Sequence, residues 1–271
     1  MIRRAQPWLG TLVEIGVEGT HDHDAVNAAF AAVARVHRLM SFHDPASEVA
    51  RFNRAAAGEL VTVERDTWEV VRIALEVCAL SDGVFDIGCA PRLVEWGVLP
   101  APEQAVPAAL PCTEVLALER EGCVRKLAPG WIDLGGIAKG YAVDQAVQVL
   151  REALVPGACV NAGGDLRVFG QTQLPVAVRA PHAPGVAATV TMLHDAALAT
   201  SGSYFSARQH SGRTVSALVD TRAGTPLVTR HSASVRAPSC VLADALTKVV
   251  LLTGNAYHPA LAACGATAFF V

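Results

Sequence analysis

The stretch "WIDLGGIAKGYAVDQAVQVL", residues 131–150, joins a short extended segment to a helical pattern through two adjacent glycines. Gly135 and Gly136 have no side chain, so the backbone can turn sharply there and a ligand can approach it closely. The following helix would point its free N–H groups and its positive dipole end at that ligand. Lys139 falls in the first turn of this helix and could reach a phosphate. The stretch predicts either an anion-binding turn or an ordinary strand-to-helix turn with a surface lysine.

Two familiar nucleotide-binding motifs do not fit this turn. A P-loop requires a serine or threonine directly after its lysine, whereas Gly140 and Tyr141 follow Lys139. The glycines are also not spaced as in the G-x-G-x-x-G dinucleotide fingerprint. The stretch alone therefore does not name the anion.

The composition indicates a chain with ample material for a hydrophobic core. Of its 271 residues, 52% are hydrophobic and only 17% are charged, compared with about 25% charged residues in typical soluble proteins. The net charge of −3 argues against a nucleic-acid-binding protein, which usually carries a basic excess.

The chain shows no membrane or export signal. No apolar run reaches the ~18–20 residues of a membrane span, and no apolar segment follows Arg3 and Arg4 as in a signal peptide. The seven cysteines form no C-x-x-C pair and are interpreted as small reduced core residues, which favours a reducing compartment. The sequence as written predicts a cytoplasmic protein; the alternative is an exported protein whose leader has been removed.

The hydrophobic patterns predict an α+β protein. Alternation predicts a strand from about Leu9 to Val17, and a helical stripe covers residues 23–40. A second helix is predicted from an N-cap at Asp66 to a stop at Gly83, and a proline-rich loop follows over residues 100–111. The second half reads as short strands "ACVNAG", "LPVAVRA", "AATVTML", "TVSALVD", "SASVRAP" and "ATAFFV", with an apolar helix "CVLADALTKVVLL". Without a repeat or a linker, residues 1–271 are predicted to form one domain with largely antiparallel sheet.

Six glycine- or aspartate-rich motifs occur along the chain in a recognisable order. They are "MSFHDPASE" (40–48), "GVFDIGCAPRLVEWG" (83–97), "DLGGIAKGYAVD" (133–144), "NAGGDL" (161–166), "TSGSY" (200–204) and "ADAL" (243–246). In order and spacing, they resemble the motifs of the FAD:protein FMN transferase family, also called the ApbE family. The resemblance extends from about Leu9 to Gly254.

This resemblance implies an ApbE-like (T-fold-like) domain, with a mostly antiparallel sheet and packed helices. Family members bind FAD as a substrate and, with Mg²⁺, cleave its pyrophosphate; FMN goes to a threonine or serine of an acceptor protein and AMP leaves. The implied partners are FAD and a flavin-acceptor protein. The anion at the glycine turn would then be the pyrophosphate. Such phosphoryl-type transfer depends mainly on positioning and charge neutralisation.

The resemblance also implies a set of site residues. The FAD-binding positions correspond to Met40, His43, Val84, Phe85, Asp86, Asp133 and Lys139, where His43 replaces a frequent tyrosine. The backbone carbonyl of Gly136 and the carboxylate of Asp244, which is also the catalytic candidate, match family metal ligands; oxygen ligands suit Mg²⁺. Independently, a carboxylate in the apolar helix around Asp244 would require a cation.

Simpler structural roles exist for several acidic residues. Asp133 and Asp144 could cap or solvate a helix, and this role is the favoured one for Asp144. Asp165 follows a Gly-Gly pair and is expected to hold that turn.

The chain departs from the family pattern at the metal motif. The family has a threonine ligand four residues after the aspartate, whereas here Thr247 lies three residues after Asp244 and Lys248 lies four after it. Lys248 is one helical turn from Asp244, in the favourable acid-before-base order. Its ammonium is predicted to occupy the metal position, which places the use of Mg²⁺ in doubt.

A second departure lies in "SALVDTRAGTP", where Ala217 stands at the position of a family histidine that is thought to assist catalysis. No spacing argument identifies His210 or His231 as a substitute. Three hypotheses follow: an active Mg²⁺-dependent flavin transferase, an FAD- or nucleotide-binding protein with little or no transferase activity, and a scaffold for interactions only. Retention of Lys139 and Asp244 argues against the third hypothesis.

Overall fold

The computed structural model describes residues 2–19, 23–204 and 206–271. The chain forms two compact units, each assembled from separate stretches of the sequence. Unit 1 consists of Met1–His37, Ile137–Ser201 and His231–Val271, and unit 2 consists of Arg38–Gly136 and Gly202–Arg230. The organisation of residues 1–271 as one domain stays a prediction.

Unit 1 is built on a sheet that, within the described residues, has seven strands in the order β1-β2-β6-β7-β8-β13-β14. The strands are β1 (Ile2–Trp8), β2 (Thr11–Glu18), β6 (Gly157–Ala162), β7 (Asp165–Ala180), β8 (Ala183–Gly202), β13 (Ser232–Ala237) and β14 (Thr267–Phe270). The pairs β1–β2, β2–β6, β6–β7, β7–β8 and β13–β14 are antiparallel. The predicted α+β class with a mostly antiparallel sheet is therefore confirmed.

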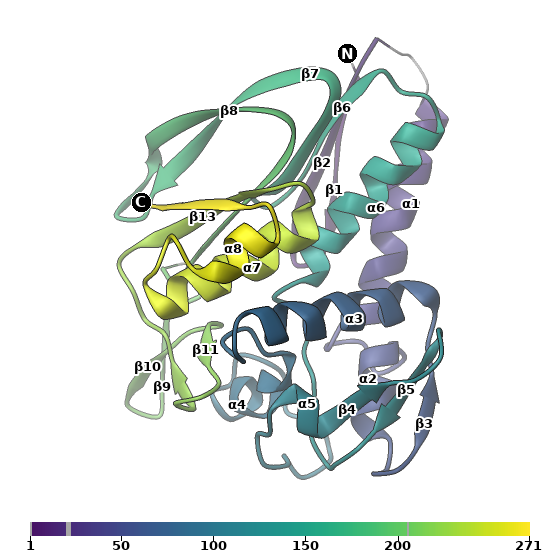
Figure 1. Ribbon diagram of the computed structural model, residues 1–271, viewed down its shortest axis with the longest axis vertical. Helices are drawn as coiled ribbons and strands as arrows, with labels where there is room; N and C mark the ends of the chain where they lie inside the picture. The colour runs from purple at the N-terminus through teal and green to yellow at the C-terminus, as the bar shows by residue number, and fades with distance from the viewer. Residues whose placement is uncertain (1, 20–22, 205) are drawn as a thin grey trace. The chain divides into compact units, whose positions relative to one another are not determined.

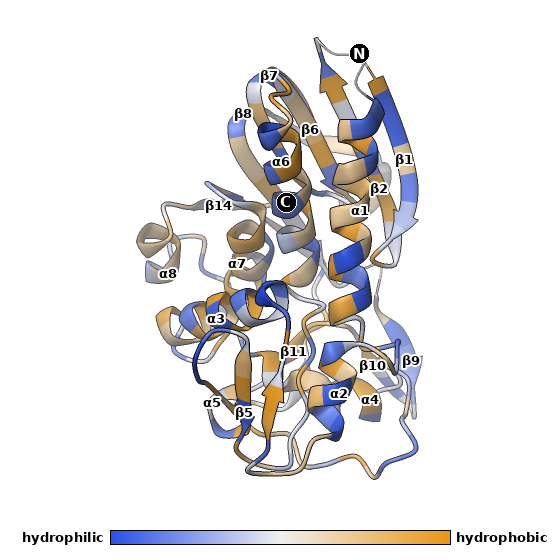
Figure 2. Ribbon diagram, turned by 90° about the vertical axis from the view of Figure 1, so that its right-hand side faces the viewer, coloured by the Kyte–Doolittle hydropathy of each residue, from blue (hydrophilic) through white to orange (hydrophobic). Residues whose placement is uncertain are grey.

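Helices cover this sheet on one side (Figure 1). They are α1 (His23–Met40), α6 (Ala138–Glu152) and α7 (Cys240–Thr253), and a short α8 (Pro259–Ala263) precedes β14. Helix α6 packs on β6 and β7, while α7 packs on β7 and β13 and against α6. Hydrophobic and hydrophilic segments alternate along α1 (Figure 2), as expected for a helix with one face in the core.

A side chain from α6 holds the start of α7. Asp144 accepts hydrogen bonds from the backbone N–H groups of Cys240 at 3.0 Å and Val241 at 2.8 Å, which would otherwise lack partners in the first helical turn. Arg167 of β7 donates to the same carboxylate. Asp144 therefore has the predicted capping role, although the helix it caps is α7 rather than its own.

Gly140 allows α6 and α7 to approach closely. A Cβ atom at this position would lie 2.3 Å from the Cys240 carbonyl oxygen and 2.8 Å from Val241 Cα. Any larger residue would therefore push the two helices apart.

Unit 2 consists of short elements. Its helices are α2 (Glu48–Arg54), α3 (Arg65–Leu80), α4 (Ala90–Glu95) and α5 (Cys112–Val115), with a 3-10 turn η1 (Ile87–Cys89). Its strands are β3 (Leu60–Thr62), β4 (Leu116–Leu118), β5 (Cys123–Lys126), β9 (Arg208–His210), β10 (Arg213–Val215), β11 (Val219–Asp220) and β12 (Thr225–Pro226). Residues 101–111 are in neither helix nor strand, which confirms the predicted proline-rich loop.

Several predicted boundaries are wrong. The first strand is preceded by β1, and a turn at Leu9 and Gly10 separates β1 from β2, which begins at Thr11. Helix α3 has its N-cap at Glu64, so Asp66 lies inside the first turn. The segment "TVSALVD" is split between β10 and β11, with residues 216–218 outside any strand.

Two features of the described residues concern membrane-spanning segments and the cysteines. None of their helices combines the length and hydrophobicity that a membrane crossing requires. No disulfide joins any of the seven cysteines, all of which lie within the described residues; four of them are buried and three are half-buried.

Candidate functional site

The predicted site residues fall in both units. Lys139 and Asp244 belong to unit 1, and the structure brings their charged groups together. The others belong to unit 2: Met40, His43, Val84, Phe85, Asp86, Asp133 and Gly136. That these two groups form one FAD site stays a prediction.

Asp244 is a fully buried carboxylate in the middle of α7. Its Oδ2 accepts a hydrogen bond at 3.1 Å from the Gly140 N–H, in the first turn of α6. Its Oδ1 contacts the ammonium of Lys248, which also donates to the Asp244 backbone carbonyl at 2.9 Å. The helix N-terminus that was expected to bind an external anion therefore already holds a carboxylate of the chain itself.

Lys139 connects Asp244 to a second buried carboxylate. Its Nζ lies 2.8 Å from Asp165 Oδ2, at the start of β7, and 3.4 Å from Asp244 Oδ2. Its side chain is 30% exposed. We call the group formed by Lys139, Asp165, Asp244 and Lys248 the ion-pair cluster. It contains two positive and two negative charges.

The Asp165 prediction is wrong on one point, because another side chain holds the Gly-Gly turn. The side chain of Asn161 accepts a hydrogen bond from the Gly164 N–H at 2.8 Å, which fixes the turn between β6 and β7. The backbone of Asp165 directly follows this turn, and its carboxylate instead pairs with Lys139. Only the fold could reveal this role, because residues 139 and 165 are far apart in the sequence.

The cluster separates the pKa values of its two carboxylates. Burial would raise the pKa of Asp244, but the charges of Lys139 and Lys248 outweigh it and hold that pKa below its usual value. Burial, together with the nearby charge of Asp244, raises the pKa of Asp165 despite its contact with Lys139. Burial disfavours a charged Lys139, yet the two carboxylates raise its pKa above the ordinary lysine value. Asp244 is therefore the more acidic carboxylate of the pair.

The hydroxyl of Thr247 also has hydrogen-bond partners within the protein. Its hydroxyl donates to the Asp244 backbone carbonyl at 2.6 Å and lies 2.7 Å from the hydroxyl of Ser201, in the "TSGSY" motif. Ser201 was not predicted as a site residue. The motif resemblance is the only sequence signal that pointed to its neighbourhood.

In this arrangement, the residues expected to hold Mg²⁺ do not fit the ion. Mg²⁺ requires oxygen ligands in near-octahedral geometry at about 2.0–2.1 Å. Both carboxylate oxygens of Asp244 already have donors, and the Thr247 hydroxyl is hydrogen-bonded. Lys248 occupies the position of the family's threonine ligand, four residues after Asp244, and a protonated ammonium has no lone pair with which to coordinate a metal.

The glycine turn of unit 2 is held by hydrogen bonds rather than by strand pairing. Ile132 exchanges two hydrogen bonds with the side chain of Asn53, at 2.8 and 2.9 Å, and the Asp133 N–H donates to the Ile87 carbonyl. Asp133 Oδ2 accepts from the Gly135 N–H at 3.1 Å. The strand-like segment 131–134 is therefore not a strand, since a side chain satisfies the backbone that a neighbouring strand would have paired.

The remaining predicted FAD residues differ in exposure. Met40, Val84 and Phe85 are buried, and His43 is exposed. Asp86 is half-buried and caps η1, accepting from the N–H groups of Gly88 at 2.7 Å and Cys112 at 3.0 Å. Burial raises the pKa of Asp86 despite these donors. Their contact with FAD stays a prediction.

At the position of the missing family histidine, Ala217 is exposed, and its N–H donates to the Ser206 hydroxyl at 3.3 Å. The ring of His210 packs near Gly97 in the same unit; a Cβ added at Gly97 would lie 3.2 Å from it. These contacts assign no catalytic role to His210.

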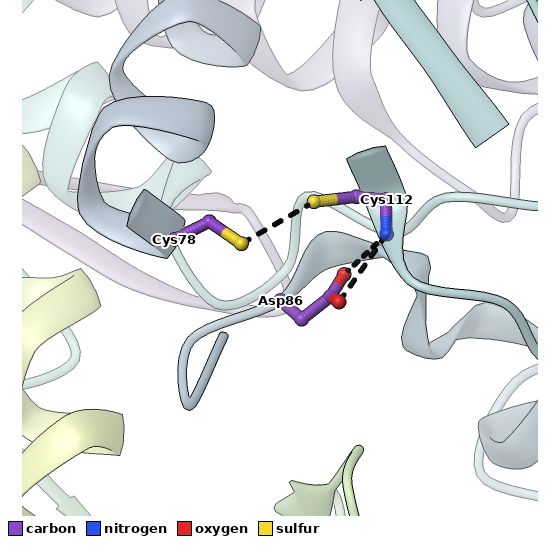
Figure 3. Close-up of side chains that lie close together, drawn as sticks. All are labelled: Cys78, Asp86 and Cys112. Carbon is purple, nitrogen blue, oxygen red and sulfur yellow. Dashed lines mark hydrogen bonds between the residues drawn. The ribbon is translucent and has the colours of Figure 1, made fainter. Parts of the chain in front are cut away.

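The sequence did not predict that one group of reactive side chains lies close together. Cys78, Asp86 and Cys112 each place one potential ligand atom within 4.8 Å of the others (Figure 3). The two cysteines lie 34 residues apart and in no recognised motif, so their isolated sequence positions indicated only buried thiols. We call this group the thiol cluster.

The fold and the ion-pair cluster define an α+β protein whose charged motif residues converge at the contact between α6 and α7. A family model described as the ApbE family matches residues 9–270, and the chain belongs to this family.

Relatives and solved structures agree with this assignment. The FAD:protein FMN transferase of Vibrio cholerae serotype O1 is 29% identical over 235 residues, covering 81% of this chain and 70% of that protein. The FAD:protein FMN transferase of Rhodobacter capsulatus is 30% identical over 271 residues, covering 94% of this chain but 52% of that protein. The structure is similar to that of the Thermotoga maritima ApbE protein, with a TM-score of 0.86, 26% identity, and coverage of 100% of this chain and 94% of that one. It also resembles the flavin transferase ApbE from Vibrio cholerae, with a TM-score of 0.81, 25% identity, and coverage of 99% and 92%.

Proposed function

We propose that this protein binds FAD and transfers its FMN moiety to a threonine or serine of an acceptor protein, releasing AMP. Membership of the ApbE family over residues 9–270 and the names of the relatives support this function. The structural observation that carries it is the meeting of two family motifs, through Lys139 and Asp244, in one buried ion-pair cluster.

The proposed reaction exchanges a phosphoanhydride bond for a phosphoester bond. The acceptor hydroxyl oxygen bonds to the FMN phosphorus, the P–O–P bridge of FAD breaks, AMP leaves with the bridging oxygen, and the hydroxyl proton passes to solvent. Such a reaction requires positioning and charge neutralisation more than covalent help. The ammonium of Lys139, whose side chain is 30% exposed, is the proposed contact of this chain for the pyrophosphate.

We assign the other FAD contacts by the motif resemblance alone. They are Met40, His43, Val84, Phe85, Asp86 and Asp133. Asp244 is the proposed catalytic residue, and Gly136 and Asp244 are the positions where the family pattern would place metal ligands.

We further propose that Lys248 supplies the positive charge at Asp244 that Mg²⁺ would otherwise provide. The ammonium of Lys248 contacts Asp244 Oδ1 and would repel a divalent ion from the same place. A single ammonium neutralises less charge than Mg²⁺ and cannot coordinate two phosphoryl oxygens at once. The same contact favours a second candidate function: FAD binding with little or no transfer.

Incubation of the purified protein with FAD, with and without Mg²⁺, tests both candidates. A threonine-containing acceptor protein is included, AMP is quantified, and covalent flavin on the acceptor is read by in-gel fluorescence. AMP together with a flavinylated acceptor supports the transferase. Saturable FAD binding without AMP supports the second candidate. The absence of FAD binding at near-millimolar ligand, with and without Mg²⁺, would contradict both.

A further inference from the structure

The thiol cluster brings together three residues from separate segments of unit 2. Cys78 lies in the last turn of α3, Asp86 caps η1, and Cys112 is the first residue of α5. The two sulfur atoms lie 3.7 Å apart, with the Asp86 carboxylate beside them (Figure 3). One potential ligand atom of each residue thus lies within 4.8 Å of the other two.

Among the described residues, the half-buried Asp86 differs from the buried Asp144 and Asp244 in having no basic side chain as an ion-pair partner. Asp244 pairs with two lysines, and Asp144 pairs with Arg167. Among residues 2–19, 23–204 and 206–271, Asp86 has backbone N–H donors but no basic side chain as an ion-pair partner. Even a half-buried carboxylate without a counter-charge carries a desolvation cost, and a bound cation would relieve that cost.

We propose that Cys78, Cys112 and Asp86 bind one thiophilic divalent metal ion of the zinc class. Thiolate ligands select zinc-like ions, whereas Mg²⁺ prefers all-oxygen sites. A tetrahedral ion with Zn–S bonds of about 2.3 Å holds its two sulfurs about 3.8 Å apart, close to the observed 3.7 Å. A disulfide, in contrast, would require the sulfurs to approach to about 2.05 Å.

Metal binding releases the two thiol protons to solvent and converts both cysteines to thiolates. Two thiolates and one carboxylate supply three ligands, and water fills the fourth position. The ion would tie the start of α5, at the end of the loop over residues 101–111, to the end of α3. It would also fix the carboxylate of Asp86.

Cobalt titration under reducing conditions tests this proposal, because tetrahedral Co²⁺ with thiolate ligands has a characteristic absorption. The folded, metal-free protein should bind one Co²⁺ with thiolate-to-cobalt absorption, and Zn²⁺ should displace it. Cys78→Ala and Cys112→Ser should lose this absorption. Cys264→Ser, which alters a half-buried cysteine of unit 1, should retain it.

Asp86→Asn separates metal binding from folding, since its amide oxygen can still accept from the Gly88 and Cys112 N–H groups. This variant should keep the thiolate absorption but bind Co²⁺ more weakly than the unaltered protein. Absence of thiolate-to-cobalt absorption in the unaltered, folded protein would overturn the proposal. So would equal absorption in folded Cys78→Ala, or a Cys78–Cys112 disulfide found by peptide mass analysis of freshly isolated protein.

Discussion

Two regions of the molecule hold lysine ammonium groups in different surroundings. In unit 2, Lys126 is 1% exposed; it donates to the backbone carbonyls of Phe52 and Gly130 and lies over the Phe52 ring. Among the described residues, no carboxylate forms an ion pair with Lys126. In unit 1, Lys139 and Lys248 meet the buried carboxylates of the ion-pair cluster.

The comparison separates the effect of burial from that of counter-charge. Burial alone lowers the pKa of Lys126 to about 8. In the ion-pair cluster, burial acts in the same direction on Lys139, but the carboxylates reverse it and raise the pKa. A buried lysine therefore keeps its charge at all ordinary pH values only where carboxylates face it. The ion-pair cluster in unit 1 is such a place for Lys139.

The largest effect is expected for Asp244→Ala. Removing the carboxylate takes from Lys248 its ion-pair partner and leaves Lys139 with Asp165 alone, and the free energy of unfolding should fall by about 3–5 kcal/mol. Urea unfolding followed by circular dichroism measures this change.

The matched control for Asp244→Ala is an exposed ion pair of unit 2. Glu121 pairs with Arg65, and their side chains are 64% and 84% exposed. Glu121→Ala should change the free energy of unfolding by less than about 1 kcal/mol. If the two variants lost equal stability, or if Asp244→Ala altered neither stability nor FAD binding, the described role of Asp244 would be wrong.

The second effect depends on pH and concerns Lys126→Met. The pKa of Lys126 is about 8 in the folded protein and 10.5 for an ordinary lysine, so the unfolded chain binds more protons between these values. Stability should therefore rise with pH across this window, by up to about 3 kcal/mol, through this residue. Below pH 8, the cost of burying the charge is fully present.

Lys126→Met should remove that share of the pH dependence. The free energy of unfolding is measured at pH 7 and at pH 10.5 for both proteins. The change between the two pH values is then compared between the proteins, so that the contributions of groups that titrate in both cancel. A pH dependence of the variant equal to that of the unaltered protein would show that Lys126 stays charged despite its burial.

The smallest effect in this series is expected for Gly140→Ala. A Cβ atom there would lie 2.3 Å from the Cys240 carbonyl oxygen, so α6 and α7 must separate. Overpacking of this kind costs about 1–3 kcal/mol and would weaken the Gly140 N–H bond to Asp244. Thermal unfolding should show the loss, whereas Gly185→Ala, at a site with nothing within 4 Å, should leave the transition almost unchanged.

Much of the fold could be predicted from local patterns. The alternation in β2 places Val13, Ile15 and Val17 in the core, and α7 follows its continuous apolar run. Strand β1, which contains Arg3, Arg4 and Pro7, carries no such alternation, and only its pairing with β2 defines it. The WIDL segment has a strand-like composition, but the distant Asn53 side chain takes its backbone hydrogen bonds.

The site was predictable to the extent that it depends on spacing along one helix. Lys248 lies one turn from Asp244, and their contact follows from helix geometry. The partners that come from other elements did not follow from the sequence. Asp165 and the Gly140 N–H reach the cluster only because β7 and α6 pack beside α7, and Cys78 reaches Cys112 across 34 residues.

The central claim is that the ammonium of Lys248 occupies the cation position at Asp244. Calorimetric titration of the folded protein with Mg²⁺, beside Lys248→Thr, tests it most directly, because threonine restores an oxygen ligand and removes the charge. Lys248→Met serves as the control that removes the charge without adding a ligand. Lys248→Thr should bind Mg²⁺ at least about tenfold more tightly than the unaltered protein, a difference of about 1.4 kcal/mol, with Lys248→Met between them. Equally tight Mg²⁺ binding by the unaltered protein, lost in Asp244→Asn, would contradict the claim.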